Sequence, residues 1–180
     1  MVLKVVSDAI PHRSDVGLVA VGLRDEGELR SAWDRLSRRV DDLGRRPDVA
    51  GFLIQEMARG ILEVFAGVSR DPDFGLVLAF GAGGVLIEAL DDVALRPLPL
   101  RAGDAAAMIV ETRAAALLGG VRGRPPGDVD ALVRALEAIG DFAWAERESL
   151  AELDVNPIVV REKGAGCVVV DALIVPRART

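Results

Sequence analysis

Short apolar stretches bounded by glycine, proline or charged residues recur along the chain and predict several strands. They cover residues 2–7, 18–23, 51–57, 62–68 and 76–80, and a further short one ends near Arg96. Runs of four to eight aliphatic or β-branched residues between turn residues are typical of buried strands. The first two thirds of the chain therefore read as strand-rich.

Three other segments repeat apolar residues every three or four positions, which is the period of an amphipathic helix. They are residues 26–43, 102–118 and 128–146. In the first, one stripe that we expect to face the core consists of Leu29, Trp33, Leu36 and Val40. Asp25 or Glu26 can open this helix, and Asp128 can cap the last one. Strands and helices together predict an α+β fold.

The end of the chain predicts a β-hairpin with apolar arms. Its arms are residues 152–157 and 168–171, and its turn contains Gly164 and Gly166. If Lys163 and Gly164 form the centre of the turn, Asn156 lies opposite Asp171. Pro157 lacks an N–H group and restricts the residue before it, which favours an edge or a bulge there.

One face of this hairpin collects oxygen donors. Because side chains alternate along a strand, Glu152, Asp154 and Asn156 share a face, and the register adds Asp171 to it. Carboxylate and amide oxygens are ligands that Mg²⁺ accepts when it is bound beside nucleotide phosphates. The alternative is a surface hairpin whose acidic side chains are simply solvated.

Composition narrows the class of protein. The 180 residues are 51% hydrophobic, enough for one domain or two small lobes. A net charge of −6 argues against a nucleic-acid-binding surface. A single cysteine, Cys167, favours a reducing compartment and a role as a small core residue. No apolar run reaches the roughly 20 residues of a membrane span and no signal peptide precedes the first strand, so we expect a cytoplasmic protein without a membrane segment.

Two charged residues stand out near the start. Lys4 interrupts an apolar strand, and it is either an edge-strand lysine that reaches water or a cation held over phosphates. His12 is the only histidine, in a polar loop with Asp15 close by. It is either an exposed side chain or a nucleophile or base that Asp15 orients.

A glycine cluster at residues 81–84 follows a predicted strand. Such clusters can hold phosphate through backbone amides. A dinucleotide-binding fingerprint would open a helix at this point, whereas residues 85–88 have the pattern of a strand. A Rossmann fold is therefore not predicted, and a tight turn near a ligand is.

Taken together, seven segments resemble the ATP-grasp domain of ADP-forming (NDP-forming) acyl-CoA synthetases. In order they are VLKVVS (2–7), HRSDVG (12–17), FLIQEM (52–57), LEVFAGVSRDPDFG (62–75), FGAGG (80–84), VRGRPP (121–126) and ELDVNP (152–157). The resemblance implies two lobes, 1–55 and 56–180, with antiparallel sheets flanked by helices and a nucleotide bound between them. It also implies that the first elements of such a domain are missing before Met1.

The resemblance assigns roles to particular residues. It implies ATP or ADP as ligand, with Lys4 on the phosphates, the backbone of Gln55, Glu56 and Met57 on adenine, and Glu63 on ribose. It implies Mg²⁺ held by Asp154, Asn156 and Asp171 in the C-terminal hairpin. His12, assisted by Asp15, would carry the phosphoryl group. CoA-binding and ligase lobes, or a subunit that contains them, are the implied partners, and a homo-oligomer is a further possibility.

The sequence departs from the family pattern at two positions that matter. Leu18 stands where a second glycine is usual, and Leu76 stands where a proline is usual. A side chain at position 18 is expected to crowd a phosphate-binding loop. Two alternatives follow: a non-catalytic nucleotide-binding subunit or sensor on a degenerate ATP-grasp fold, and a carboxylate–amine ligase on the same fold.

Overall fold

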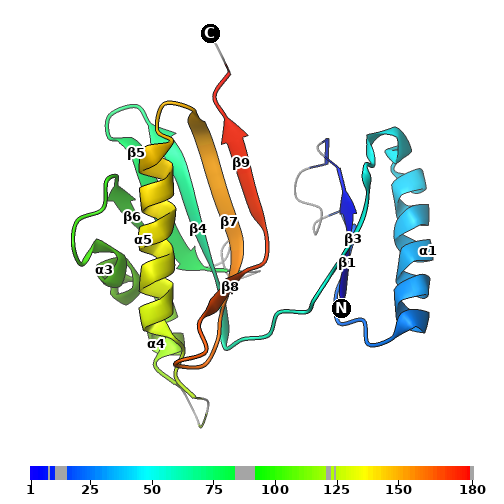
Figure 1. Ribbon diagram of the computed structural model, residues 1–180, viewed down its shortest axis with the longest axis horizontal. Coiled ribbons are helices and arrows are strands. Elements are labelled where there is room, and N and C mark those ends of the chain that lie inside the picture. The colour runs from blue at the N-terminus through cyan, green and yellow to red at the C-terminus, as the bar shows by residue number, and fades with distance from the viewer. Residues whose placement is uncertain (8, 11–15, 84–91, 121–122, 124, 179–180) are drawn as a thin grey trace. The chain divides into compact units, whose positions relative to one another are not determined.

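The computed structural model describes residues 1–7, 9–10, 16–83, 92–120, 123 and 125–178. It divides into two compact units, Met1–Met57 and Ala58–Thr180, each with a sheet and its own hydrophobic core. Figure 1 shows both units along the chain. This is the α+β arrangement of antiparallel sheets flanked by helices that the sequence predicts.

The first unit is a three-stranded antiparallel sheet covered on one face by a single long helix. The strands are β1 (Val2–Val6), β2 (Val19–Ala20) and β3 (Gly51–Gln55), in the order β2-β1-β3. The helix α1 spans Glu26–Asp42, and a short 3₁₀ turn, η1, spans Arg46–Asp48. The predicted strand over 18–23 is therefore much shorter than expected.

Helix α1 begins where its capping residue predicts. The carboxylate of Asp25 accepts the backbone N–H of Glu28 at 2.8 Å, which satisfies a donor that has no partner inside the helix. An ion pair between Arg30 and Glu26 at 2.6 Å adds a contact one turn apart. The buried face consists of Ala32, Leu36 and Val40.

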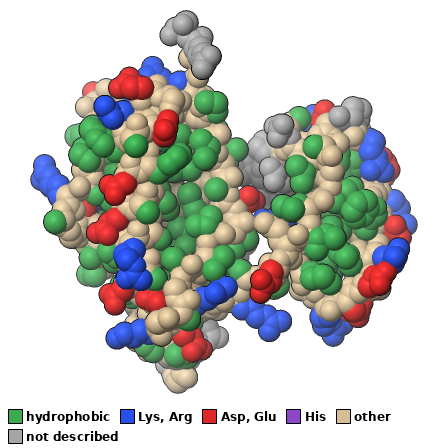
Figure 2. Space-filling view, viewed as in Figure 1, with side chains coloured by type: hydrophobic (Ala, Val, Ile, Leu, Met, Phe, Trp, Pro, Cys, Tyr) green, Lys and Arg blue, Asp and Glu red, His purple; other side chains and the backbone are tan. Residues whose placement is uncertain are grey.

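The expected stripe of α1 is wrong at Trp33, which is 43% exposed. Its ring stacks on Phe52 of β3 with centroids 4.0 Å apart. Strand β3 also differs from the buried strand that was expected, since Leu53 and Ile54 are 44% and 50% exposed. β3 is an edge strand: Ile54, which pairs with Leu3, lies on the face that α1 covers incompletely, and Leu53, which pairs with Lys4, lies on the opposite face. Figure 2 shows hydrophobic side chains gathered on the surface of this unit.

The second unit is built on a six-stranded antiparallel sheet. Its strands are β4 (Leu62–Asp71), β5 (Gly75–Ala82), β6 (Val93–Pro97), β7 (Leu150–Val160), β8 (Cys167–Val169) and β9 (Ala172–Pro176). The order is β6-β5-β4-β7-β8, and β9 also pairs with β7. Strand β7 therefore pairs with β4 on one side and with both β8 and β9 on the other. We call strands β7, β8 and β9 the β7–β9 ribbon.

One face of this sheet is covered by α3 (Asp104–Glu111), α4 (Ala114–Leu118) and α5 (Val129–Ala145). The single helix predicted over 102–118 is wrong, because Thr112 has an extended backbone (φ −103°, ψ 159°) that separates α3 from α4. The prediction for α5 is confirmed, including its capping residue Asp128. None of the helices in the described part of the chain is both long and apolar enough to cross a bilayer.

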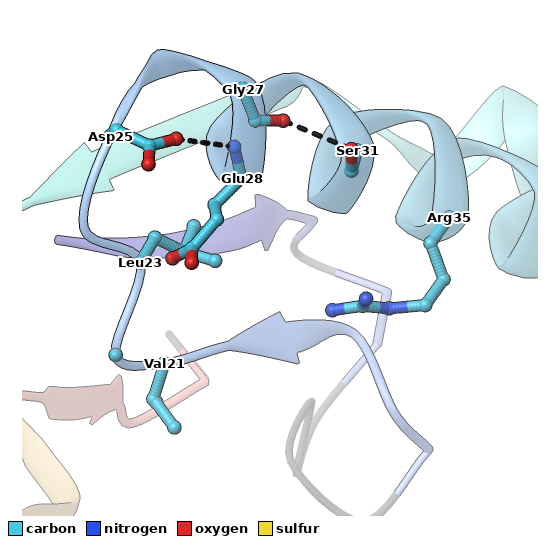
Figure 3. A pocket seen from close by; sticks show the side chains of 8 residues that line it. Val21, Leu23, Asp25, Gly27, Glu28, Ser31 and Arg35 are labelled. Atoms are coloured by element: carbon cyan, nitrogen blue, oxygen red, sulfur yellow. Dashed lines mark hydrogen bonds between the residues drawn. The ribbon is translucent and has the colours of Figure 1, made fainter.

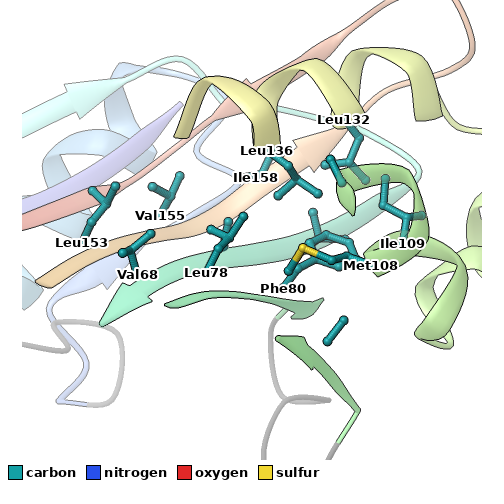
Figure 4. Packing of buried hydrophobic residues seen from close by; sticks show 14 of the residues in the cluster. Val68, Leu78, Phe80, Met108, Ile109, Leu132, Leu136, Leu153, Val155 and Ile158 are labelled. Carbon is teal, nitrogen blue, oxygen red and sulfur yellow. The ribbon is translucent and has the colours of Figure 1, made fainter. Parts of the chain in front are cut away.

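The core of the second unit lies between the sheet and these helices. Figure 4 shows Phe80 and Leu78 of β5 beneath Leu136 of α5 and Met108 of α3, and all four are fully buried. Alternate residues of β4, β5 and β7 reach this layer, so the intervening residues occupy the opposite, helix-free face. Cys167 packs against the same core, as predicted for a small apolar residue, and burial raises the pKa of its thiol.

Candidate functional site

Lys4 and Gln55 lie on the face of the first sheet that α1 does not cover. Leu3 packs in the core under α1, so the next residue, Lys4, points to the opposite face. Gln55 pairs with Val2, which places its side chain on the same face as Lys4. Lys4 is 7% exposed and sits on the central strand. The alternative of an edge-strand lysine that reaches water is therefore wrong.

The resemblance assigns Gln55 to adenine through its backbone and gives no role to its side chain. Its Oε1 atom is buried and has no hydrogen-bond partner in the described part of the chain. A buried acceptor left unpaired costs about 1–3 kcal/mol, so a donor from a ligand is the natural partner. Glu56 and Met57 follow directly after β3; Glu56 is exposed and Met57 is half-buried.

Leu18 does not crowd the surface of this unit. Its side chain is fully buried and belongs to the core cluster that contains Leu3, Val5 and Leu36. The side chain therefore packs under α1, and the expectation that it crowds the phosphate-binding loop stays a prediction. The loop residues His12 and Asp15 lie outside the described residues, and their predicted roles stay predictions.

In the second unit the β7–β9 ribbon has the register that the sequence predicts. Val159 pairs with Val168, and Val155 pairs with Ala172. Between these pairs, the N–H of Asn156 donates to the carbonyl of Asp171 at 3.1 Å. Asp171 therefore lies opposite Asn156.

The donors of the ribbon lie on the helix-free face. Leu153 and Val155 are buried in the core, so Asp154 and Asn156 point to the other side. The predicted irregularity at Pro157 is confirmed, because the pairing of β7 with β4 shifts by one residue there. Pro157 lies in an inner strand, so the bulge rather than an edge position accommodates its missing N–H.

The chemistry of this donor set fits Mg²⁺. Two carboxylates and an amide oxygen, from Asp154, Asp171 and Asn156, are hard oxygen ligands, and Mg²⁺ usually takes one or two carboxylates together with phosphate oxygens and water. The described residues contain no group of three or more His, Cys, Asp or Glu side chains placed to hold a metal. An ion here would therefore depend on oxygens supplied by a phosphate ligand.

Glu63 also lies on the helix-free face, near the glycine cluster. It is exposed, and its neighbour Val64 is buried in the core. The N–H of Gly83 donates to the carbonyl of Glu63 at 2.8 Å, and a Cβ at position 83 would lie 3.0 Å from that carbonyl group. A side chain at position 83 would be tightly crowded by the backbone of β4, so glycine favours this close approach and the end of β5 lies beside Glu63.

Two pockets in the described residues lie away from these groups. One, of about 500 Å³, is in the first unit and is shown in Figure 3. Its lining is Val21, Gly22, Leu23, Asp25, Gly27, Glu28, Ser31 and Arg35. Asp25 in it caps α1, and the Ser31 hydroxyl donates to the Gly27 carbonyl at 2.9 Å, so these polar groups serve the helix. A second pocket, of about 330 Å³, includes Arg59 and Arg161. Neither contains a predicted site residue.

The model of the ATP-grasp domain family matches residues 1–175. The β subunit of an ADP-forming acetate–CoA ligase II from Pyrococcus furiosus is 35% identical over 96% of this chain, which spans 73% of that subunit. The ADP-forming acetate–CoA ligase II of Archaeoglobus fulgidus is 41% identical over 97% of this chain, which spans 24% of that protein.

Solved structures agree with these relatives. The acetyl-coenzyme A synthetase 1 of Ca. Korarchaeum cryptofilum, in complex with coenzyme A and Ca-AMPCP, is 42% identical with a TM-score of 0.87, over 98% of this chain and 76% of that one. Another structure of that enzyme (39% identical over 98% of this chain and 76% of that one, TM-score 0.79) holds Mg-AMPPCP, with a phosphohistidine segment directed towards the nucleotide-binding site. The chain therefore belongs to the ATP-grasp domain family, in the branch found in ADP-forming acyl-CoA synthetases.

Proposed function

We propose that this chain binds MgATP and passes its γ-phosphoryl group through His12 in an ADP-forming acyl-CoA synthetase. The observation that carries the proposal is the register of the β7–β9 ribbon, which aligns Asn156 with Asp171 on the same edge as Asp154. Nucleotide-bound Mg²⁺ is held by oxygen donors of this kind, and this register brings the three of them to one face of the sheet.

The first unit would supply the cation and the base-recognition groups. A lysine on the central strand of a sheet is a point charge with little freedom, which suits contact with β- and γ-phosphate oxygens. Lys4 is such a residue, with 7% of its surface exposed. Gln55, Glu56 and Met57 would contact adenine and Glu63 the ribose, and the unpaired Oε1 of Gln55 supports a donor group arriving there.

The second unit would hold the metal. When bound there, Mg²⁺ would supply neutralisation of the phosphate charge. The protein's part is to fix the carboxylates of Asp154 and Asp171 and the amide of Asn156 on one face. Phosphoryl transfer depends mainly on such positioning, so small displacements of the ribbon are expected to affect rate more than fold.

The phosphoryl group would move by nucleophilic displacement. A nitrogen of the His12 imidazole attacks the γ-phosphorus, a P–N bond forms, the bond to the bridging oxygen breaks, and ADP leaves. Asp15 would accept a hydrogen bond from the other ring nitrogen and keep the imidazole in the reactive tautomer. Acyl and CoA chemistry would take place on lobes or subunits of the kind that fill the rest of the fused relative, of which this chain spans 24%.

Ligand-induced stabilisation tests the binding half of the proposal. With MgATP at a hundred times its dissociation constant, the unfolding free energy should rise by about 2.7 kcal/mol. Asp154→Asn should reduce this gain with MgATP, whereas Glu152→Gln, a change on the same strand outside the proposed ligand set, should retain it. An unchanged melting temperature with millimolar MgATP and MgADP would refute the proposal.

Phosphorylation tests the transfer half. Incubation with γ-labelled ATP should leave acid-labile, alkali-stable label on the protein, and His12→Ala should abolish it while preserving MgATP binding. Asp15→Asn should slow labelling without removing it. Label that persists in His12→Ala would exclude the relay through this residue, and binding without any label in the unsubstituted protein would favour a nucleotide sensor.

A further inference from the structure

The carboxylate of Asp128 joins two elements that are far apart in the sequence. Its Oδ1 accepts the N–H of Ala131 at 3.0 Å and so caps α5. Its Oδ2 accepts the N–H groups of Gly164 and Gly166, at 2.9 and 2.8 Å, in the turn between β7 and β8. The residue is only 6% exposed. A single buried side chain thus ties the start of α5 to the turn of the β7–β9 ribbon.

The backbone around Asp128 reinforces this connection. The N–H of Asp128 donates to the carbonyl of Arg161 at 2.9 Å, and the N–H of Lys163 donates to the carbonyl of Pro126 at 2.9 Å. The segment before α5 therefore lies alongside the turn. Gly164 and Gly166 have φ of 85° and 81°, a backbone region that glycine adopts without strain. Both amides are thereby directed at one carboxylate oxygen.

The electrostatics of Asp128 agree with this geometry. Its backbone hydrogen bonds, from Gly166 first and then from Ala131, hold the pKa of the carboxyl below its usual range, against the opposing effect of burial. The group is therefore ionised at neutral pH, and hydrogen bonds to an ionised acceptor are stronger than neutral ones. This makes the link between helix and turn strong.

The turn determines which residues of the ribbon face each other. In a hairpin, the conformation of the turn sets the register, and a slip of one residue sends every side chain to the other face of the sheet. Here the register continues past the turn through Val160–Cys167 to Val155–Ala172. A slip would remove Asp171 from the side of Asn156.

We propose that Asp128 is a positioning residue for the metal-binding face, because its carboxylate fixes the turn and thereby the register of the β7–β9 ribbon. The proposal rests on the proposed function for the identity of that face. Asp128 itself touches neither metal nor nucleotide in this scheme. It acts through the hairpin.

A substitution that keeps the helix cap but loses the turn tests this role. Serine is a good helix cap, so Asp128→Ser should retain the bond to Ala131, but its one short hydroxyl cannot also reach Gly164 and Gly166. Two control variants show whether the loss of a charge or a change of helix cap alone produces the same result. Asp130→Asn removes a charge from the same helical turn, and Asp25→Ser alters the cap of α1, a helix of the first unit.

The first measurement is amide hydrogen exchange of the whole protein. In Asp128→Ser, the amides of Asn156 and Val170, which donate across the ribbon, should exchange at least about tenfold faster. Amides between β4 and β5, such as that of Gly67, should keep their protection. Equal protection of Asn156 and Val170 in Asp128→Ser and in both controls would overturn the proposal, whatever the protein binds.

The second measurement is the affinity for Mn²⁺ as a probe ion, in the presence of ADP. Substitutions behind metal ligands typically lower metal affinity 10–100-fold, and Asp128→Ser should fall in this range, with ADP affinity in the absence of metal unchanged. A purely structural role would lower both affinities together, and that result would overturn the proposal. If the unsubstituted protein binds no Mn²⁺ with ADP, the proposed function fails while the exchange result still decides on the register.

If Asp128→Ser does not fold, Asp128→Asn replaces it. Asparagine keeps the shape of the side chain and one acceptor oxygen but loses the charge, so both effects should be smaller and have the same direction. A folded Asp128→Asn with unchanged exchange and unchanged Mn²⁺ affinity would overturn the proposal.

Discussion

The two units of this chain differ in how much core supports the residues assigned to function. In the first, Lys4 and Gln55 are carried by a three-stranded sheet whose described core has eight buried apolar residues under one helix. In the second, the ribbon is carried by a six-stranded sheet with a described core of twenty-one. Small units bury a lower fraction of their surface, so the first should be the less stable of the two.

This difference separates two ways of losing function. Damage to the first unit should weaken binding of the nucleotide through local opening, whereas damage to the second should unfold the larger part of the chain. The two tryptophans make the distinction measurable, because Trp33 lies in the first unit and Trp144 in the second. Replacing either one with phenylalanine leaves a fluorescence signal from the other unit.

The largest effect is expected from the core of the second unit. Phe80 is fully buried, and Phe80→Ala should cost about 3–5 kcal/mol of unfolding free energy through lost burial and the cavity left behind. Urea denaturation followed by Trp144 fluorescence measures it. Phe74→Ala, at a position 68% exposed, is the matched control and should stay within about 0.5 kcal/mol. Similar shifts in the two variants would contradict the assignment of the core.

The next effect tests whether the units unfold separately. Leu36 is buried under α1, and Leu36→Ala should cost about 2–5 kcal/mol, concentrated in the first unit. The Trp33 transition should then move to lower urea while the Trp144 transition stays in place. A joint shift of both signals would show that the two units unfold as one, which would contradict a separate, less stable first unit.

A smaller effect is expected on the affinity for MgATP. Lys4→Met removes a charge-assisted contact worth about 1.5–3 kcal/mol, which corresponds to a ten- to hundredfold loss of MgATP affinity. Calorimetric titration measures the affinity, and Lys163→Met, at an exposed turn residue, is the control. Equal affinity in Lys4→Met and the unsubstituted protein would remove Lys4 from the site.

The smallest expected effect is on the stability of the protein at acidic pH. The folded pKa of Asp128 is below its unfolded value, which is about 3.9, so its contribution to stability is complete above that value and is lost as pH falls through the folded pKa. The difference in urea midpoint between the unsubstituted protein and Asp128→Ser should be constant near neutral pH and shrink below about pH 4. A difference that is the same at pH 3 and pH 7 would contradict this.

Features with a local cause could be predicted from the sequence. The cap and length of α5 follow from Asp128 and the helical period, and the pairing of Asn156 with Asp171 follows from the turn glycines. The bulge at Pro157 follows from a missing N–H. The family resemblance, confirmed by the match over residues 1–175, depended on several such segments in order.

Features decided by tertiary packing could not be predicted. Trp33 has the correct period to be buried, but only packing shows that α1 leaves β3 partly open. The break at Thr112 has no glycine or proline to signal it. The second role of Asp128 was also missed, since its contact with Gly164 joins residues 36 positions apart. The signal in the sequence was the pair of turn glycines, Gly164 and Gly166, because their N–H groups need an acceptor.

Strand β7 is the common partner of β8 and β9, and this has a consequence for how the chain tolerates insertions and deletions. One residue added within the paired segments, between Asn156 and Val160 or between Cys167 and Asp171, would move Asp171 to the other face unless a bulge absorbed it. A residue added in the turn after β7 can be absorbed there, because hairpin loops of several lengths join paired strands. The lengths of the paired segments, more than the length of the turn, should therefore be what selection preserves.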